Sequence, residues 1–178
     1  MVRDEYVEAF NWLSSLESCL SQFSVICGPA GIGKTLFLYY CLVRRLSMKL
    51  PTAFSLEPEE RVFVFHEGGV RDLAPRAAPS FCLRGWWALL DAGQASDPPP
   101  SSLVIGFRVV LASSDKRQYK GWVKQRHGML YHMKTWTCDE IRAVASIQQR
   151  PSLPTLSTKA WYERFPQYAA LSWTTRAS

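Results

Sequence analysis

A glycine-rich stretch constrains the fold of this chain more than any other feature of the sequence. Residues 28–35 read Gly-Pro-Ala-Gly-Ile-Gly-Lys-Thr and satisfy the phosphate-loop pattern G-x-x-x-x-G-K-[ST] in full. A short β-prone run, 23–27, precedes the stretch, and a run that is apolar nearly all round, 35–46, follows it. Strand, glycine loop and buried helix in this order predict a site at which main-chain N–H groups face phosphate oxygens. The alternative is a glycine-rich turn that matches the pattern by chance.

The last two residues of this loop carry side chains with a defined use in such a site. We expect Lys34 to neutralise the β and γ phosphates of a nucleoside triphosphate and the Thr35 hydroxyl to coordinate Mg²⁺. The predicted ligands are therefore Mg²⁺ and ATP, which we prefer to GTP although no base-reading motif is recognisable. The backbone of the expected cradle belongs to Gly28, Pro29, Ala30, Gly31, Ile32 and Gly33.

Hydrophobic patterning predicts further strands and two more helices. Apolar residues recur at three- and four-residue steps in 4–20, which is typical of an amphipathic helix. Thr137 and Glu140 match a reciprocal capping box at the start of another helix, which should end near Gln149 because Pro151 follows. Besides 23–27, the predicted strands are 62–66, 86–90, 104–112 and 129–133.

Strands separated by crossovers of this length indicate an α/β domain with a mainly parallel, five-stranded sheet between layers of helix. We assign residues 1–150 to this core, including its N-terminal helix. Residues 151–178 are expected to form a C-terminal extension packed on the core.

A nucleotide site of this kind needs an acidic partner for the metal ion, and Asp91 is the best candidate. It follows five apolar residues, which should place it at the carboxyl end of the sheet, where ligands of open α/β sheets bind. The alternative is a turn-forming aspartate. Hydrolysis also needs a group that orients water, and Ala92 stands where a glutamate often follows the acid. Glu67, after the strand 62–66, is the proposed replacement, and a solvated turn carboxylate is its alternative.

Polar residues also follow the predicted strand 104–112. Ser113, Ser114 and Asp115 occupy the place of a polar sensor that contacts the γ phosphate. Ordinary turn chemistry explains the same three residues equally well.

The chain carries 21 Lys and Arg against 15 Asp and Glu, a net charge of +6 that permits an acidic partner. Part of the excess lies in 116–126, where Tyr119 and Trp122 alternate with cations. Such a mixture can contact the phosphates of a nucleic acid and stack on its bases. We favour a solvated helix face with aromatic residues beneath it, because long cationic side chains commonly cover apolar surface.

Cysteine spacing and hydropathy indicate the kind of cellular compartment in which the chain folds. The five cysteines form no C-x-x-C pair and leave one over, which fits a reducing compartment, nucleus or cytoplasm, better than a disulfide framework. No apolar run approaches the roughly 18 residues that cross a bilayer, so we expect no membrane partner. The three histidines have no metal-ligand spacing.

Four stretches together resemble one branch of the P-loop NTPases. They are residues 28–44, Trp87-Ala88-Leu89-Leu90-Asp91, Ala112-Ser113-Ser114 followed by Trp122, and 130–141 with its Met-x-x-Trp-Thr-x-x-Glu-Ile segment. The branch is the NTPase domain shared by Crinkler-type effector proteins of fungi and oomycetes and the retrotransposon hot spot proteins of trypanosomes. The resemblance spans about residues 20–150.

This resemblance implies a three-layer, ASCE-type (AAA-like) ATPase core. It implies that Lys34 and Thr35 contact nucleotide and magnesium and that Asp91 is the strand-terminal acid. Members of the family commonly join this core to a nuclease-like or kinase-like module, and several act in nuclei.

Two functions follow as hypotheses. The first is an ATPase in which slow, Mg²⁺-dependent hydrolysis drives a conformational switch. The second, motivated by Ala92, is a nucleotide-gated interaction or effector module that does not hydrolyse ATP and binds a protein partner or a second copy of itself. A third and weaker hypothesis is nucleic-acid binding through 116–126.

Overall fold

The computed structural model describes residues 2–16, 23–56, 61–73, 85–92, 103 and 106–147. The chain divides into two compact units, residues 1–134 and 135–178. This division comes earlier in the chain than the boundary expected at residue 150. The expected C-terminal extension, 151–178, lies outside the described residues.

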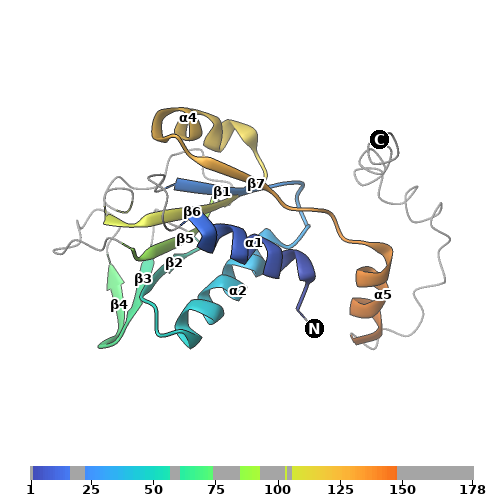
Figure 1. Cartoon of the computed structure of the whole chain (residues 1–178), viewed down its shortest axis with the longest axis horizontal. Coiled ribbons are helices and arrows are strands. Elements are labelled where there is room, and N and C mark those ends of the chain that lie inside the picture. The colour runs from blue at the N-terminus through green and yellow to red at the C-terminus, as the bar shows by residue number, and fades with distance from the viewer. Residues whose placement is uncertain are drawn as a thin grey trace. The chain divides into compact units, whose positions relative to one another are not determined.

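The first unit is built on a mixed, mostly parallel β-sheet, which confirms the expected α/β class (Figure 1). Within the described residues the sheet has seven strands in the order β4-β3-β2-β5-β6-β1-β7. Its parallel part contains β2 (Thr52–Ser55), β5 (Trp87–Asp91), β6 (Arg108–Ser113), β1 (Phe23–Cys27) and β7 (Met129–His132). A hairpin of β3 (Val62–His66) and β4 (Gly69–Leu73) extends the sheet beyond β2, and β3 runs antiparallel to both of its neighbours.

The expected count of five strands is therefore wrong, because two short strands escape the sequence pattern. β2 has four residues, Thr-Ala-Phe-Ser, too few to show a period of two. β4 begins with Gly69 and contains Arg71 and Asp72, residue types that are depleted in strands. The strand expected over 104–112 is shorter as well: β6 begins at Arg108, and Leu103 and Gly106 are helical.

Helices cover both faces of the sheet in Figure 1. α1 (Asp4–Ser15) and α2 (Lys34–Ser47) lie on one face, and α4 (Lys116–Arg126) lies on the other. The central strands β1, β5 and β6 are buried almost throughout, as expected for parallel strands covered on both sides.

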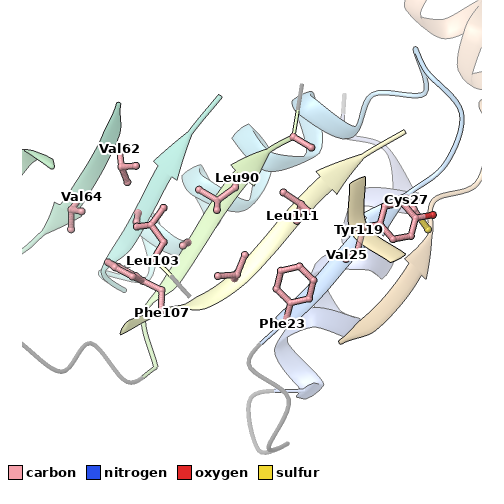
Figure 2. Packing of buried hydrophobic residues seen from close by; sticks show 14 residues of the cluster. Phe23, Val25, Cys27, Val62, Val64, Leu90, Leu103, Phe107, Leu111 and Tyr119 are labelled. Atoms are coloured by element: carbon pink, nitrogen blue, oxygen red, sulfur yellow. The ribbon is translucent and has the colours of Figure 1, made fainter. Parts of the chain in front are cut away.

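The face under α4 holds one continuous apolar cluster, shown in Figure 2. Alternate residues of each strand point to this face. Tyr119 of α4 is buried in the cluster, and the ring of Trp122 lies 5.4 Å from that of Phe23. The labelled strand residues of the cluster are Phe23, Val25, Cys27, Val62, Val64, Leu90 and Leu111.

Aromatic side chains dominate the opposite face. Phe10 of α1 lies 5.8 Å from Trp87 of β5 and 6.0 Å from Tyr40 of α2, measured between ring centroids. Tyr6 lies 5.6 Å from Phe37. The expected helix near the N-terminus therefore packs on the core through its apolar stripe, and its last described residue is Leu16.

The second unit contributes one described helix, α5 (Cys138–Ile147). Its start confirms the predicted capping box: the Thr137 N–H donates to Glu140 Oε2 at 2.7 Å, and the Glu140 N–H donates to Thr137 Oγ1 at 3.2 Å. Among the helices of the described ranges, none combines the length and apolarity that a bilayer crossing requires.

A buried cation joins α2 to the amino ends of two strands. Arg45 is 2% exposed, and its guanidinium donates to Thr52 Oγ1 at 3.0 Å, to the Pro51 carbonyl at 3.3 Å and to the Gly85 carbonyl at 3.4 Å. The same group stacks 4.2 Å from the ring of Trp87.

We predict that Arg45→Met lowers the free energy of unfolding by about 3 kcal/mol, because buried acceptors lose their donor. Arg44→Met is the matched control: Arg44 is exposed, and its removal should cost less than about 1 kcal/mol. Urea unfolding of the whole chain measures both. Equal losses in the two variants would contradict the assignment of Arg45.

Candidate functional site

The glycine-rich loop connects β1 to α2, as the sequence predicts. β1 ends at Cys27 and α2 begins at Lys34, with Gly33 as its N-cap in the left-handed region (φ 95°). Gly28 has φ 149°, and a Cβ at this position would lie 2.5 Å from Ile32 Cδ1 and 3.2 Å from the Met133 carbonyl oxygen. Only glycine fits both the conformation and the space. The loop therefore wraps tightly over the end of β1.

Lys34 is largely buried beside this loop. Its Nζ donates to the carbonyls of Gly28 at 3.0 Å and Pro29 at 2.8 Å, so the ammonium group lies against the start of the loop. Burial lowers the pKa of Lys34, and the nearby Asp91 carboxylate opposes this shift. A phosphate in the loop would give the buried cation a second anionic partner.

Thr35 and Asp91 form the central contact of the site. The Thr35 hydroxyl donates to Asp91 Oδ2 at 2.5 Å. Asp91 is the last residue of β5, in register with Ala112 of β6, and Cys27 of β1 is in register with Ser113 of the same strand. Parallel register therefore brings the acid and the loop to one edge of the sheet, with β6 between their strands.

This pair fits a magnesium ion by its chemistry. A hydroxyl and a carboxylate are hard oxygen donors, and Mg²⁺ typically takes one or two protein ligands, with waters and substrate phosphates completing its shell. Among the described residues, those of this site included, no three His, Cys, Asp or Glu side chains form a group that could hold a metal ion.

A cavity of about 430 Å³ opens over the loop. Its lining is polar where the loop, Lys34 and Asp91 contribute and apolar at Leu36 and Leu56, which the sequence did not single out. Both leucines are substantially exposed, Leu36 to 59%. The lining residues are Ala30, Gly31, Gly33, Lys34, Thr35, Leu36, Leu56, Asp91 and Ser114.

The three residues expected to act as a sensor separate into different roles. Ser114 lines the cavity. Ser113 Oγ donates to Gln118 Oε1 at 2.5 Å and accepts from the Asp115 N–H at 3.3 Å. Asp115 is the N-cap of α4 and accepts from the Arg117 N–H at 2.8 Å, and bonds to Arg117 lower its pKa. Turn and capping chemistry thus accounts for Ser113 and Asp115.

Glu67 does not belong to the site. It lies in the turn after β3, and β3 is antiparallel to β2, so Phe65 pairs with Thr52 at the amino end of β2. Thr52 is in turn paired with Trp87, at the start of the strand that ends on Asp91. Glu67 therefore lies at the sheet edge opposite Asp91, and its expected role as the residue that orients water is wrong.

The basic segment 116–126 forms α4, and its aromatic residues face the core. Tyr119 is buried, and burial raises its pKa to about 12. Trp122 packs against the apolar cluster. Cations remain on the solvent side, at Lys116, Arg117, Lys120, Lys124 and Arg126. The favoured interpretation, a solvated face above aromatic residues, is confirmed, and base stacking by these two rings loses its support.

Tyr6 of α1 and Arg3, the N-cap of that helix, also contact the loop, although no motif marked them. Arg3 Nη1 donates to the Ile32 carbonyl at 3.1 Å, and Tyr6 Oη donates to the Gly33 carbonyl at 2.8 Å. The sequence separation of 29 and 27 residues leaves no local signal for either contact.

Comparison of the chain with models of known protein families and with curated proteins finds no match. The class that the fold itself defines is an α/β protein with a mostly parallel sheet. Any more specific assignment rests on the loop, the cavity and the side chains around them.

We predict that Gly28→Ala lowers stability by about 2 kcal/mol or more, because the new methyl group meets both a disfavoured φ and occupied space. Gly69→Ala is the matched control, since Gly69 also has positive φ (110°) but no atom within 4 Å of the place that a methyl group would take. Guanidinium unfolding should show a smaller loss for Gly69→Ala. A larger loss there would show that φ, rather than close packing, limits position 28.

Proposed function

We propose that this protein is a Mg²⁺-dependent P-loop nucleoside triphosphatase that binds ATP. The observation that carries the proposal is the bond between Thr35 and Asp91 at the rim of a cavity formed by the glycine loop. It unites, from separate parts of the chain, the two oxygen ligands that a magnesium–triphosphate complex needs.

The order of strands supports the finer class. β6 lies between β1, which carries the loop, and β5, which carries the acid. The strand that carries the loop and the strand that carries the acid thus end at one edge of a mainly parallel sheet, which fits the ASCE-type core that the sequence resembles. The proposal therefore keeps the likeness to Crinkler-type and retrotransposon hot spot NTPase domains as its best guide.

Each residue of the site has a physical task in this proposal. Main-chain N–H groups of the loop, aided by the positive end of α2, hold the phosphate oxygens. Lys34 offsets their negative charge, and its burial strengthens that attraction. Thr35 and Asp91 would hold the metal ion, which would neutralise charge on the transferred phosphate when bound. Leu36 and Leu56 offer apolar contact to whatever part of the nucleotide extends beyond the loop.

A second function, nucleotide-gated binding without turnover, is favoured by one observation. Asp91 is the one carboxylate among the cavity-lining residues that the structure describes, and it is bonded to Thr35. Ala92 follows it, and Glu67 lies at the other edge of the sheet. Binding of ATP is common to both functions, and release of phosphate distinguishes them.

We predict that Lys34→Ala weakens ATP binding at least about tenfold, because a charged contact to phosphate contributes about 1.5–3 kcal/mol. Lys120→Ala, on the exposed face of α4, should leave the dissociation constant unchanged. Isothermal titration calorimetry with ATP, GTP and tripolyphosphate measures the effect. Unaltered affinity in the Lys34 variant would reject the site.

We also predict that Asp91→Asn removes most of the gain in ATP affinity that Mg²⁺ provides and lowers phosphate release more than it lowers metal-free binding. A neutral amide is a poorer magnesium ligand than a carboxylate. Glu67→Gln is the control with the same change of charge. We expect it to have no effect, because Glu67 lies at the edge of the sheet opposite Asp91. Loss of phosphate release with Glu67→Gln alone would contradict this arrangement. If the wild-type protein binds ATP and releases no phosphate, the non-hydrolysing function holds.

A further inference from the structure

Two side chains at the start of α1 contact the phosphate loop, beside which this helix lies in Figure 1. Arg3 is 4% exposed and Tyr6 8%, so both side chains are buried where they meet the carbonyls of Ile32 and Gly33. These two carbonyls belong to the last turn of the loop, immediately before Lys34. Both donors therefore act on the peptide groups that lead into α2.

The direction of these carbonyls fixes the direction of two N–H groups. In a planar trans peptide the C=O and the following N–H point to opposite sides. When Arg3 holds the Ile32 carbonyl toward α1, the Gly33 N–H must point away from α1, and Tyr6 imposes the same on the Lys34 N–H through the Gly33 carbonyl. Gly33 and Lys34 both line the cavity. The two α1 contacts thus hold cavity-lining amides in a direction that suits an anion.

Helix formation alone does not fix both peptides. The Gly33 carbonyl also accepts from the Phe37 N–H at 2.9 Å, as the first bond of α2. The Ile32 carbonyl precedes the N-cap and has no place in the helical ladder. Arg3 therefore supplies an orienting bond that the helix cannot.

The two donors are themselves held in place. Arg3 Nη2 donates to the Lys134 carbonyl at 3.0 Å, and buried Glu5 accepts from the Lys134 N–H at 2.9 Å. The ring of Tyr6 lies 5.9 Å from Tyr40, in the aromatic face between α1 and α2. Groups fixed by packing and secondary contacts orient their partners at little entropic cost on binding.

From this geometry we propose that Arg3 and Tyr6 are positioning residues of the phosphate site, which keep the Gly33 and Lys34 amides directed at a bound triphosphate. The proposal rests on the proposed function and deepens it. It makes α1 part of the binding site, although neither Arg3 nor Tyr6 lines the cavity.

Tyr6→Phe and Arg3→Lys test this role. Tyr6→Phe deletes the hydroxyl and keeps the ring, and Arg3→Lys keeps the charge but cannot span both the Ile32 and Lys134 carbonyls. The matched controls are Tyr40→Phe, in the same aromatic face, and Arg44→Lys, on the exposed side of α2. Calorimetry of the whole chain with ATP and with tripolyphosphate gives dissociation constants, and thermal unfolding without ligand gives the stability of each variant.

We expect Tyr6→Phe to raise the dissociation constant about 3- to 10-fold, and by the same factor for ATP and tripolyphosphate, because the loss lies in the phosphate cradle. Arg3→Lys should raise it further, and both controls should stay within about twofold of the wild type. A purely structural role would lower the melting temperature and leave the affinity of the folded protein unchanged.

Affinities within twofold of the wild type for Tyr6→Phe would overturn the inference while leaving the proposed function intact, whether or not Arg3→Lys folds. A rise for ATP alone, with tripolyphosphate unaffected, would also overturn it. A folded wild-type protein that binds neither ligand would reject the proposed function, and this inference with it.

Discussion

Peptide groups cannot turn a carbonyl one way without turning the next N–H the other way, and the loop between β1 and α2 depends on that coupling. Glycine at position 28 lets the backbone pass under the Met133 carbonyl, where a side chain would not fit. Arg3 and Tyr6, two buried side chains at the start of α1, donate to the Ile32 and Gly33 carbonyls of the loop. The N–H groups of Gly33 and Lys34 therefore point away from α1. The anion binding that we propose for this site therefore depends on the contacts between α1 and the loop as well as on the glycine pattern.

Strand direction decides which side chains join the site. β1, β5 and β6 are parallel and in register, so Asp91 and the loop meet at their carboxyl edge although their strands are not neighbours. One reversed strand has the opposite effect: β3 takes Glu67 to the far edge. The antiparallel direction of β3 thus excludes Glu67 from the site, where the order of strands along the chain had led us to expect it.

Local patterns predicted the parts of the fold that local forces determine. The loop at 28–35 needs glycine for conformation and close approach, and a short pattern records that need. Runs rich in apolar and β-prone residues identified β1, β5 and β7, whereas β2 reads Thr-Ala-Phe-Ser and contains no such run. The capping box of α5 was also readable, since Thr137 and Glu140 satisfy each other within one turn.

The parts that escaped prediction depend on distant partners. Arg3 and Tyr6 contact loop residues that are 29 and 27 positions away in the sequence, and no spacing rule predicts a contact at such a separation. The direction of β3 is fixed by its pairing with β2, a strand that the pattern did not reveal. Asp115 is a different case: an aspartate before a helix is a common N-cap, so its role was legible once the helix was expected to begin at Lys116.

The two hydrogen bonds that hold the Lys134 backbone to the start of α1 have a mechanical consequence. Lys134 is the last residue of the first unit, and its carbonyl and N–H are bonded to Arg3 and Glu5. Tension on the chain from residue 135 onward would therefore load a guanidinium that also grips the Ile32 carbonyl. Because Arg3 donates to both the Ile32 carbonyl and the Lys134 carbonyl, a force applied to the chain after Lys134 would be transmitted to the loop, and a displacement of the loop would be transmitted to Lys134.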